Sequence, residues 1–239
     1  MVFIKRKLFI LSAVFILTSS LVLMYFSNNK QLLKISVFSS NINQETIIID
    51  AGHGGFDGGA VALDGTVEKD INLLISHKLK DMLQLQGFNV IMTRYDDSAT
   101  DNTEDQNISS RKTSDLRNRL RLMNSSPDAI FVSIHLNKFN FASANGLQVF
   151  YSPNTAHSKN LAELIQTSVK TMLQPTNDRV VKKGTKSTYL LYNARIPAVI
   201  VECGFLSNTE ELIMLKDDTY QSKLAFCIFC GITDYYNKN

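Results

Sequence analysis

Short runs of β-branched and aromatic residues alternate along this chain with segments whose apolar residues recur every three to four positions. The runs predict strands at 46–51, 88–93, 129–135, 146–151 and 198–203. The periodic segments predict helices near 68–86, 114–124, 156–173, 208–216 and 219–236. Polar stretches at 96–110 and 174–187 indicate surface loops. Strands that alternate with helices favour an α/β fold, here a single domain with a mixed, mostly parallel sheet of about six strands covered by helices on both faces.

The first 26 residues have a different pattern from the rest. A basic cluster at 5–7 precedes residues 8–26, which are apolar apart from three serines and one threonine. Their length matches the roughly 20 residues that a membrane-spanning helix needs. The basic cluster predicts a cytoplasmic N-terminus and a domain outside the cytoplasm. The best candidate for signal-peptidase cleavage, at 18–20, would leave an apolar new N-terminus. We therefore favour an uncleaved membrane anchor over a cleaved and secreted form.

Length and composition fit this division into an anchor at 1–26, a polar linker at 27–45 and one domain at 46–239. Of the 239 residues, 44% are hydrophobic and 20% are charged, which is ordinary for a globular protein. The formal net charge of +3 comes from the cluster at 5–7, because without those three residues the 25 lysines and arginines fall to 22, equal to the 22 acidic residues. A neutral domain gives no reason to expect a nucleic-acid partner.

The three cysteines lie near the end of the chain, at Cys203, Cys227 and Cys230. An odd number so placed argues against a disulfide framework. Cys227 and Cys230 have the spacing of a metal-binding pair, but they lie in an apolar helical run with no second pair. We expect them to be small buried residues.

Histidines and carboxylates stand at the ends of predicted elements. His53 follows the strand at 46–51, His135 ends the strand at 129–135, and Glu202 lies near the end of 198–203. Glu68 opens a helix and projects toward the edge of its apolar face. Ligand sites in open α/β sheets form beyond the carboxyl ends of the strands. Two histidines and two carboxylates at one such edge are the parts of a catalytic zinc site, in which three side chains bind the metal and the fourth acts as a base.

Each candidate also has a simpler interpretation. The glycines around His53 could form a phosphate-binding loop, but the segment lacks both the glycine–lysine pattern and the third glycine of a dinucleotide loop. His135 alone could be a hydrogen-bonded strand end. Glu202 could pair with an arginine, although an apolar setting would raise its pKa and suit a base. We expect His77 and His157 to be solvated surface residues.

Four ordered motifs carry a family resemblance. They are residues 47–60, Glu68, residues 132–137 and residues 201–208, and Arg119 and Asn124 match a further spacing in the same family. Together they closely resemble the zinc-dependent N-acetylmuramoyl-L-alanine amidases over essentially all of 46–239. The departures are Leu136 and Met123 where alanine is commoner and Cys203 where threonine is commoner; Cys203 adjoins Glu202 and could slightly alter its setting.

This resemblance implies zinc held by His53, Glu68 and His135, with Glu202 as the catalytic acid and base. It also implies the substrate, the peptidoglycan amide between N-acetylmuramic acid and L-alanine. The short chain with an N-terminal anchor and no wall-binding repeats resembles the CwlD-type amidases of spore-forming bacteria, which strip peptides from cortex peptidoglycan so that muramic-δ-lactam can form. An activator protein is a possible partner.

Two other functions remain open from the sequence. One is a zinc peptidase that cleaves within the wall peptides, since spacing alone does not distinguish one amide from another. The other is a wall-binding or regulatory protein on the same fold. Such a protein has no need of Glu202, which this chain retains.

Overall fold

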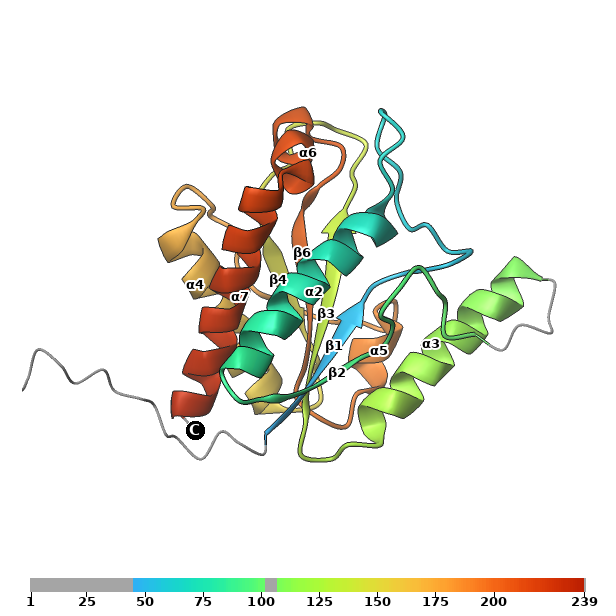
Figure 1. The fold of residues 1–239 in the computed structure, drawn as a ribbon, viewed down its shortest axis with the longest axis vertical. Helices are drawn as coiled ribbons and strands as arrows, with labels where there is room; N and C mark the ends of the chain where they lie inside the picture. The colour runs from blue at the N-terminus through green and yellow to red at the C-terminus, as the bar shows by residue number, and fades with distance from the viewer. Residues whose placement is uncertain (1–44, 102–106, 239) are drawn as a thin grey trace, which may run out of the picture. The chain divides into compact units, whose positions relative to one another are not determined.

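The computed structural model describes residues 45–101 and 107–238, which contain one six-stranded sheet (Figure 1). Its strands are β1 (Thr46–Ala51), β2 (Asn89–Met92), β3 (Ile130–Asn137), β4 (Gln148–Tyr151), β5 (Lys182–Lys183) and β6 (Ala198–Phe205). Their order across the sheet is β2-β1-β3-β6-β4-β5. All neighbours are parallel except β4 and β6, which are antiparallel. The predicted mixed, mostly parallel sheet is confirmed.

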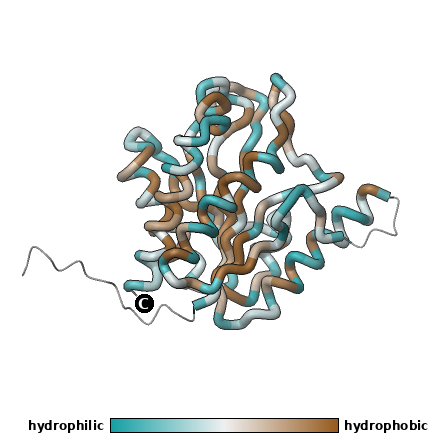
Figure 2. Tube along the Cα trace, viewed as in Figure 1, coloured by the Kyte–Doolittle hydropathy of each residue, from teal (hydrophilic) through white to brown (hydrophobic). Residues whose placement is uncertain are grey.

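Helices cover both faces of this sheet, as predicted. In the described residues they are α2 (Glu68–Leu85), α3 (Ile108–Asn124), α4 (Ala156–Met172), α5 (Tyr189–Asn193), α6 (Thr209–Lys216) and α7 (Asp218–Lys238). Figure 1 shows α2 and α7 crossing in front of the strands. The middle of the sheet is mostly hydrophobic, brown in Figure 2, because both of its faces are covered.

The two faces carry separate cores, which follow from the alternation of side chains along a strand. Ile47 and Ile49 of β1 point to the core that contains the apolar faces of α2, α4, α6 and α7. Ile48, between them, points to a smaller core with α3 and α5. All three isoleucines are fully buried. The stretch that precedes His53 is therefore fixed by packing on both sides.

Three elements differ from the sequence prediction. Helix α3 begins at Ile108 and not near residue 114, because the Asn107 side chain accepts from the backbone N–H groups of Ser109 and Ser110 and starts the helix earlier. Strand β5 and helix α5 fall in or beside the segment predicted as a loop. Strand β5 has two exposed lysines and α5 has five residues, so neither carries enough apolar pattern to be recognised.

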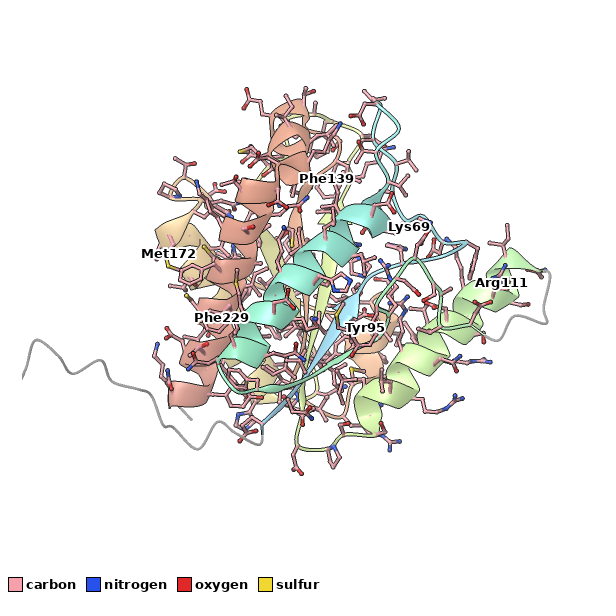
Figure 3. The ribbon with its side chains drawn as sticks, in the orientation of Figure 1. Lys69, Tyr95, Arg111, Phe139, Met172 and Phe229 are labelled. Atoms are coloured by element: carbon pink, nitrogen blue, oxygen red, sulfur yellow. The ribbon has the colours of Figure 1, made fainter. Side chains whose placement is uncertain are left out.

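The strand directions determine where a site can form. β1, β3 and β6 are parallel and end together at the upper edge of the sheet in Figure 1. Because β4 runs the other way, its first residue, Gln148, lies at this same edge. In Figure 3, Lys69 at the start of α2 and Phe139 just past the end of β3 mark this edge.

The expected anchor at 1–26, and the linker at 27–45 except its last residue, lie outside the described residues. Between residues 45 and 238, none of the described helices has the length and apolar character needed to cross a membrane. The first strand begins at Thr46.

Candidate metal centre

Three of the predicted site residues meet at the upper edge of the sheet. The Nε2 atom of His53 lies 3.3 Å from one carboxylate oxygen of Glu68, and Nδ1 of His135 lies 3.0 Å from the other. One ligand-type atom from each residue falls within 4.8 Å of those of the other two, and the described residues contain no other such group of three. Two imidazoles and a carboxylate at this separation can hold one divalent metal ion.

Glu68 is the most enclosed member of the group, with 3% of its surface exposed. It is the first residue of α2, and its carboxylate accepts from the backbone N–H groups of Ala60 at 2.8 Å and Leu136 at 3.0 Å. Burial raises the pKa of Glu68, but the interactions with His135 and His53 outweigh it and hold the pKa well below its usual range. The side chain is therefore a fixed carboxylate.

His53 has an unusual backbone, with a φ of 62° that residues other than glycine rarely adopt. Its Nδ1 atom lies 2.8 Å from the carboxylate of Asp57, which turns Nε2 toward Glu68. Burial lowers the pKa of His53, but the hydrogen bonds with Asp57 and Glu68 outweigh it and raise that pKa to about 9. These contacts favour a cation at this position.

Two glycines provide the space in which the three side chains converge. A Cβ atom on Gly52 would lie 2.3 Å from Nε2 of His135, and one on Gly59 would lie 2.6 Å from the Glu68 carboxylate and the His53 ring. Gly59 also has a φ of 71°. Any other residue at either position would push the histidines and the carboxylate apart.

Two buried arginines hold the backbone of the His53 loop from behind. Arg119 donates to the carbonyl oxygens of Ala51 at 3.0 Å and His53 at 2.7 Å. Arg94 donates to the carbonyl oxygens of Ala51 at 2.9 Å and Gly52 at 3.2 Å. With three successive carbonyls held in this way, the left-handed conformation at His53 is imposed by the surrounding structure.

Glu202 lies beside this group but is not part of it. It is paired with His135 across β3 and β6, so the two side chains project from the same face. Its Oε2 atom is buried and has no hydrogen-bond partner within the described residues. Burial raises the pKa of Glu202, more strongly than the nearby His135 lowers it. A buried carboxyl group with a raised pKa beside a cluster of ligand-type side chains is a candidate for proton transfer.

Comparison with known proteins shows the family to which this chain belongs. The sequence profile of the N-acetylmuramoyl-L-alanine amidases matches residues 47–234, which include all four of these side chains. The chain belongs to the N-acetylmuramoyl-L-alanine amidase family. It is therefore an enzyme that cleaves the amide between N-acetylmuramic acid and L-alanine in peptidoglycan.

Similar proteins place this amidase within the family. The germination-specific N-acetylmuramoyl-L-alanine amidase of Bacillus subtilis is 36% identical over 213 residues, covering 89% of this chain and 87% of that protein. The structure of the CwlD amidase from Clostridioides difficile, in complex with the GerS lipoprotein, is 43% identical with a TM-score of 0.78, covering 81% of this chain and 99% of that one. A second C. difficile amidase structure is 30% identical, with a TM-score of 0.72 over 82% and 99% of the two chains. The resemblance to the CwlD type is confirmed.

Of the other residues that the sequence analysis named, Arg119 donates to the carbonyl of His53 and the backbone N–H of Leu136 donates to Glu68. In the amidase, Asn124 joins the end of α3 to the last residue of α5 and to the chain just after it, through the carbonyl of Asn193 and the N–H of Arg195. His157 is exposed, whereas His77 is half-buried, with Nε2 3.0 Å from the carbonyl oxygen of Tyr95. All three cysteines are free; Cys203 and Cys227 are buried and Cys230 is half-buried.

Sequence reasoning missed Asp57 and Arg94 as parts of the site. Asp57 lies four residues after His53 inside the glycine-rich loop, and that spacing was the available signal. Arg94 follows a predicted strand, where an arginine ordinarily indicates a solvated end. Its contacts are to backbone carbonyls, which leave no signature in the sequence.

Proposed function

We propose that this amidase is a zinc enzyme in which His53, Glu68 and His135 hold the metal and Glu202 is the catalytic acid and base. The observation that carries the proposal is the convergence of the three ligand-type atoms within 4.8 Å. The family's chemistry supports the choice of zinc, and two histidines with one carboxylate are a usual ligand set for catalytic zinc.

The surroundings of the three residues fit a bound cation. Asp57 orients His53 through its second ring nitrogen, as carboxylates commonly orient histidines that bind metal. Backbone N–H groups orient both oxygens of Glu68. When bound, zinc lowers the pKa of a water molecule and polarises the substrate carbonyl.

Glu202 is then the group that transfers the proton of the attacking water. Its raised pKa suits a group that accepts a proton from the attacking water and passes it to the departing alanine nitrogen. Glu202 is not one of the three converging residues. A metal ion held by those three side chains alone would have a coordination position open to water and substrate. Asp50 and Arg119 keep the loop behind His53 in place throughout, since their contacts do not involve the reacting atoms.

We further propose that the enzyme acts outside the cytoplasm on spore cortex peptidoglycan, so that muramic-δ-lactam can form. The germination-specific relative from B. subtilis supports this setting. We expect residues 1–26 to anchor the chain, 27–45 to link and 46–239 to catalyse. The lipoprotein complex of the similar CwlD amidase supports an accessory protein as an activator here.

Digestion of purified peptidoglycan by the full-length protein tests the reaction. We expect mass spectrometry to find intact stem peptides with a free N-terminal L-alanine, together with glycan that carries no peptide. A chelator should abolish the release, and added zinc should restore it. Peptides cut between two amino acids would instead indicate a wall peptidase, and release that persists without zinc would contradict the proposed cofactor.

A further inference from the structure

A row of three side chains crosses the sheet at the edge of the site. Gln148, the first residue of β4, is the partner of Glu202 in the antiparallel pairing of β4 with β6. Directly opposed residues in such a pair lie about 5 Å apart and project from the same face. His135 flanks Glu202 on its other side. The row therefore runs from the metal-binding group, through the proposed base, to Gln148.

Gln148 extends this row to Arg179. Its Oε1 atom accepts from Nη1 of Arg179 at 3.2 Å, while its Nε2 atom donates to the carbonyl of Val180 at 2.8 Å. Only 3% of Gln148 is exposed, so its amide is a fixed part of the sheet edge. Arg179 is thus held two side chains away from Glu202.

Uncharged groups alone fix the guanidinium of Arg179. Its Nε atom donates to the carbonyl of Asn145 at 2.6 Å, and its central carbon lies 4.5 Å from the ring centroid of Phe205. Within residues 45–101 and 107–238, no carboxylate oxygen lies within 4 Å of this guanidinium, and its Nη2 atom makes no hydrogen bond. The side chain remains half-exposed.

The neighbouring carboxylate of Glu211 is committed elsewhere. Its two oxygens accept from the backbone N–H groups of Gly146 and Phe205, each at 2.8 Å. Burial raises the pKa of Glu211, and the charge of Arg179 lowers it without direct contact. Arg179 therefore keeps free N–H donors and a charge without an ion-pair partner.

We propose that Arg179 binds a carboxylate of the stem peptide and so selects the substrate, an inference that rests on the proposed function. A guanidinium held in one plane presents its free N–H groups as a fork that matches a carboxylate. The muramic acid carboxyl cannot be the ligand in the bound substrate, because it forms the amide that is cleaved. The carboxylate therefore belongs to the peptide.

The reach of the row indicates which peptide residue is bound. Two side-chain spacings correspond to about 10 Å, and an extended peptide advances about 3.3 Å per residue. The carboxylate then lies within the first two or three residues of the stem. The free α-carboxylate of a glutamyl residue next to the alanine meets this condition.

Two muropeptides test the inference on the full-length enzyme. One carries glutamate with a free α-carboxylate after the alanine, and in the other that carboxylate is amidated. We expect the unmodified enzyme to cleave the acidic substrate with about ten- to hundredfold higher kcat/KM, the range for a hydrogen bond to a charged partner. Arg179→Gln should lose that factor on the acidic substrate alone, mainly through KM.

Arg195→Gln is the matched control, because Arg195 is exposed and lies before β6, at the opposite end of that strand. It should preserve the preference. Equal kcat/KM of the unmodified enzyme on the two substrates would overturn the inference without needing any variant. A loss by Arg179→Gln of the same factor on both substrates would also overturn it, and would assign Arg179 a structural role. Cleavage of neither substrate would remove the proposed function and this inference with it.

Discussion

Asp50 and Glu202 are two carboxylates near the same edge of the sheet, yet their surroundings differ completely. Both oxygens of Asp50 are occupied, by Arg119, by the Ser133 hydroxyl at 2.6 Å and by the Thr93 hydroxyl at 2.8 Å. Burial raises the pKa of Asp50, but Arg119 and these hydroxyls outweigh it and lower the pKa to about 2. For Glu202, with one oxygen buried and unpartnered, burial raises the pKa.

The comparison teaches that burial alone does not decide what a carboxylate does. Asp50 is permanently charged and fully hydrogen-bonded, so it can serve only to hold Arg119 and the loop that Arg119 supports. Glu202 has a lone pair left free and a pKa shifted toward neutrality, which are the properties of an acid–base group. The hydrogen-bond and ion-pair partners of these two carboxylates, and not how deeply they are buried, determine which is structural and which is reactive.

The largest expected effect comes from removing a ligand of the proposed metal. His53→Ala should abolish zinc binding and peptide release, because two side chains cannot complete the site. Metal analysis of the purified variant, with peptide release measured on the same sample, checks this. His157→Ala, at an exposed histidine, should keep both properties. Full zinc retention in His53→Ala would rule out the proposed ligand set.

Glu202→Gln should lower turnover by about 10²–10⁴-fold, the usual contribution of general acid–base catalysis. Zinc and fold should survive, since the amide nearly preserves the volume and Glu202 is not among the converging ligand atoms. Parallel assays of zinc content and peptide release check this, with Glu210→Gln at an exposed position of α6 as the control. Loss of zinc in Glu202→Gln would make Glu202 a ligand and not the base.

Asp50→Asn removes the charge of the carboxylate that holds Arg119. It should lower the free energy of unfolding by about 3 kcal/mol, because removing one partner from a buried ion pair leaves the other charge uncompensated. Asp115 still contacts Arg119, at 2.7 Å, which limits the loss. Denaturant unfolding measures it, and Asp128→Asn, at an exposed residue, is the control. An unchanged midpoint would mean that Asp50 does not support the domain.

Asp57→Asn tests the group that orients His53. We expect about 10- to 100-fold weaker zinc binding with an intact fold, the usual effect of losing a partner of a metal-binding histidine. Competition with a zinc chelator of known affinity gives the ratio. Asp97→Asn is the comparison, because Asp97 contacts the backbone of Gly55 in the same loop but not a histidine. An equal loss in both variants would point to loop disruption.

In the unmodified protein, acid should protonate Asp50 and so remove the stability that its charge contributes. The folded-state pKa of Asp50 lies below its usual value of 3.8, so its stabilisation is complete above pH 3.8 and is lost as the pH falls toward 2. A shift of this size corresponds to about 2 kcal/mol. Unfolding free energies measured between pH 5 and pH 2 should fall less steeply in Asp50→Asn. Identical slopes would contradict the assigned pKa.

The fold was largely predictable because its strands and long helices are strongly patterned. The isoleucines of β1 and the apolar face of α2 each have one dominant period, and packing in the structure agrees with it. Where the pattern was weak the prediction failed, as at the polar start of α3 and at the two-residue strand β5. There a single cap or a neighbouring strand decides the structure.

The site was predictable only as far as residue type and strand ends carry information. His53, Glu68, His135 and Glu202 could be named because their side chains act directly. Arg94 could not, since it acts through backbone carbonyls. Asp57 acts through another side chain, and only its four-residue spacing from His53 pointed to it. The role of Arg94 depends on how the chain turns after β1, which no local pattern encodes.

The reversed direction of β4 has a consequence for how this scaffold can diversify. Because β3 ends and β4 begins at the same edge, the connection at 138–147 both leaves and returns beside the site. Exposed connections tolerate insertions, whereas strand registers do not. Phe141 in this connection is 59% exposed. Residues inserted around it would therefore add surface next to the metal-binding group without changing the pairing of any strand. The fold separates the part that can vary from the part that must not.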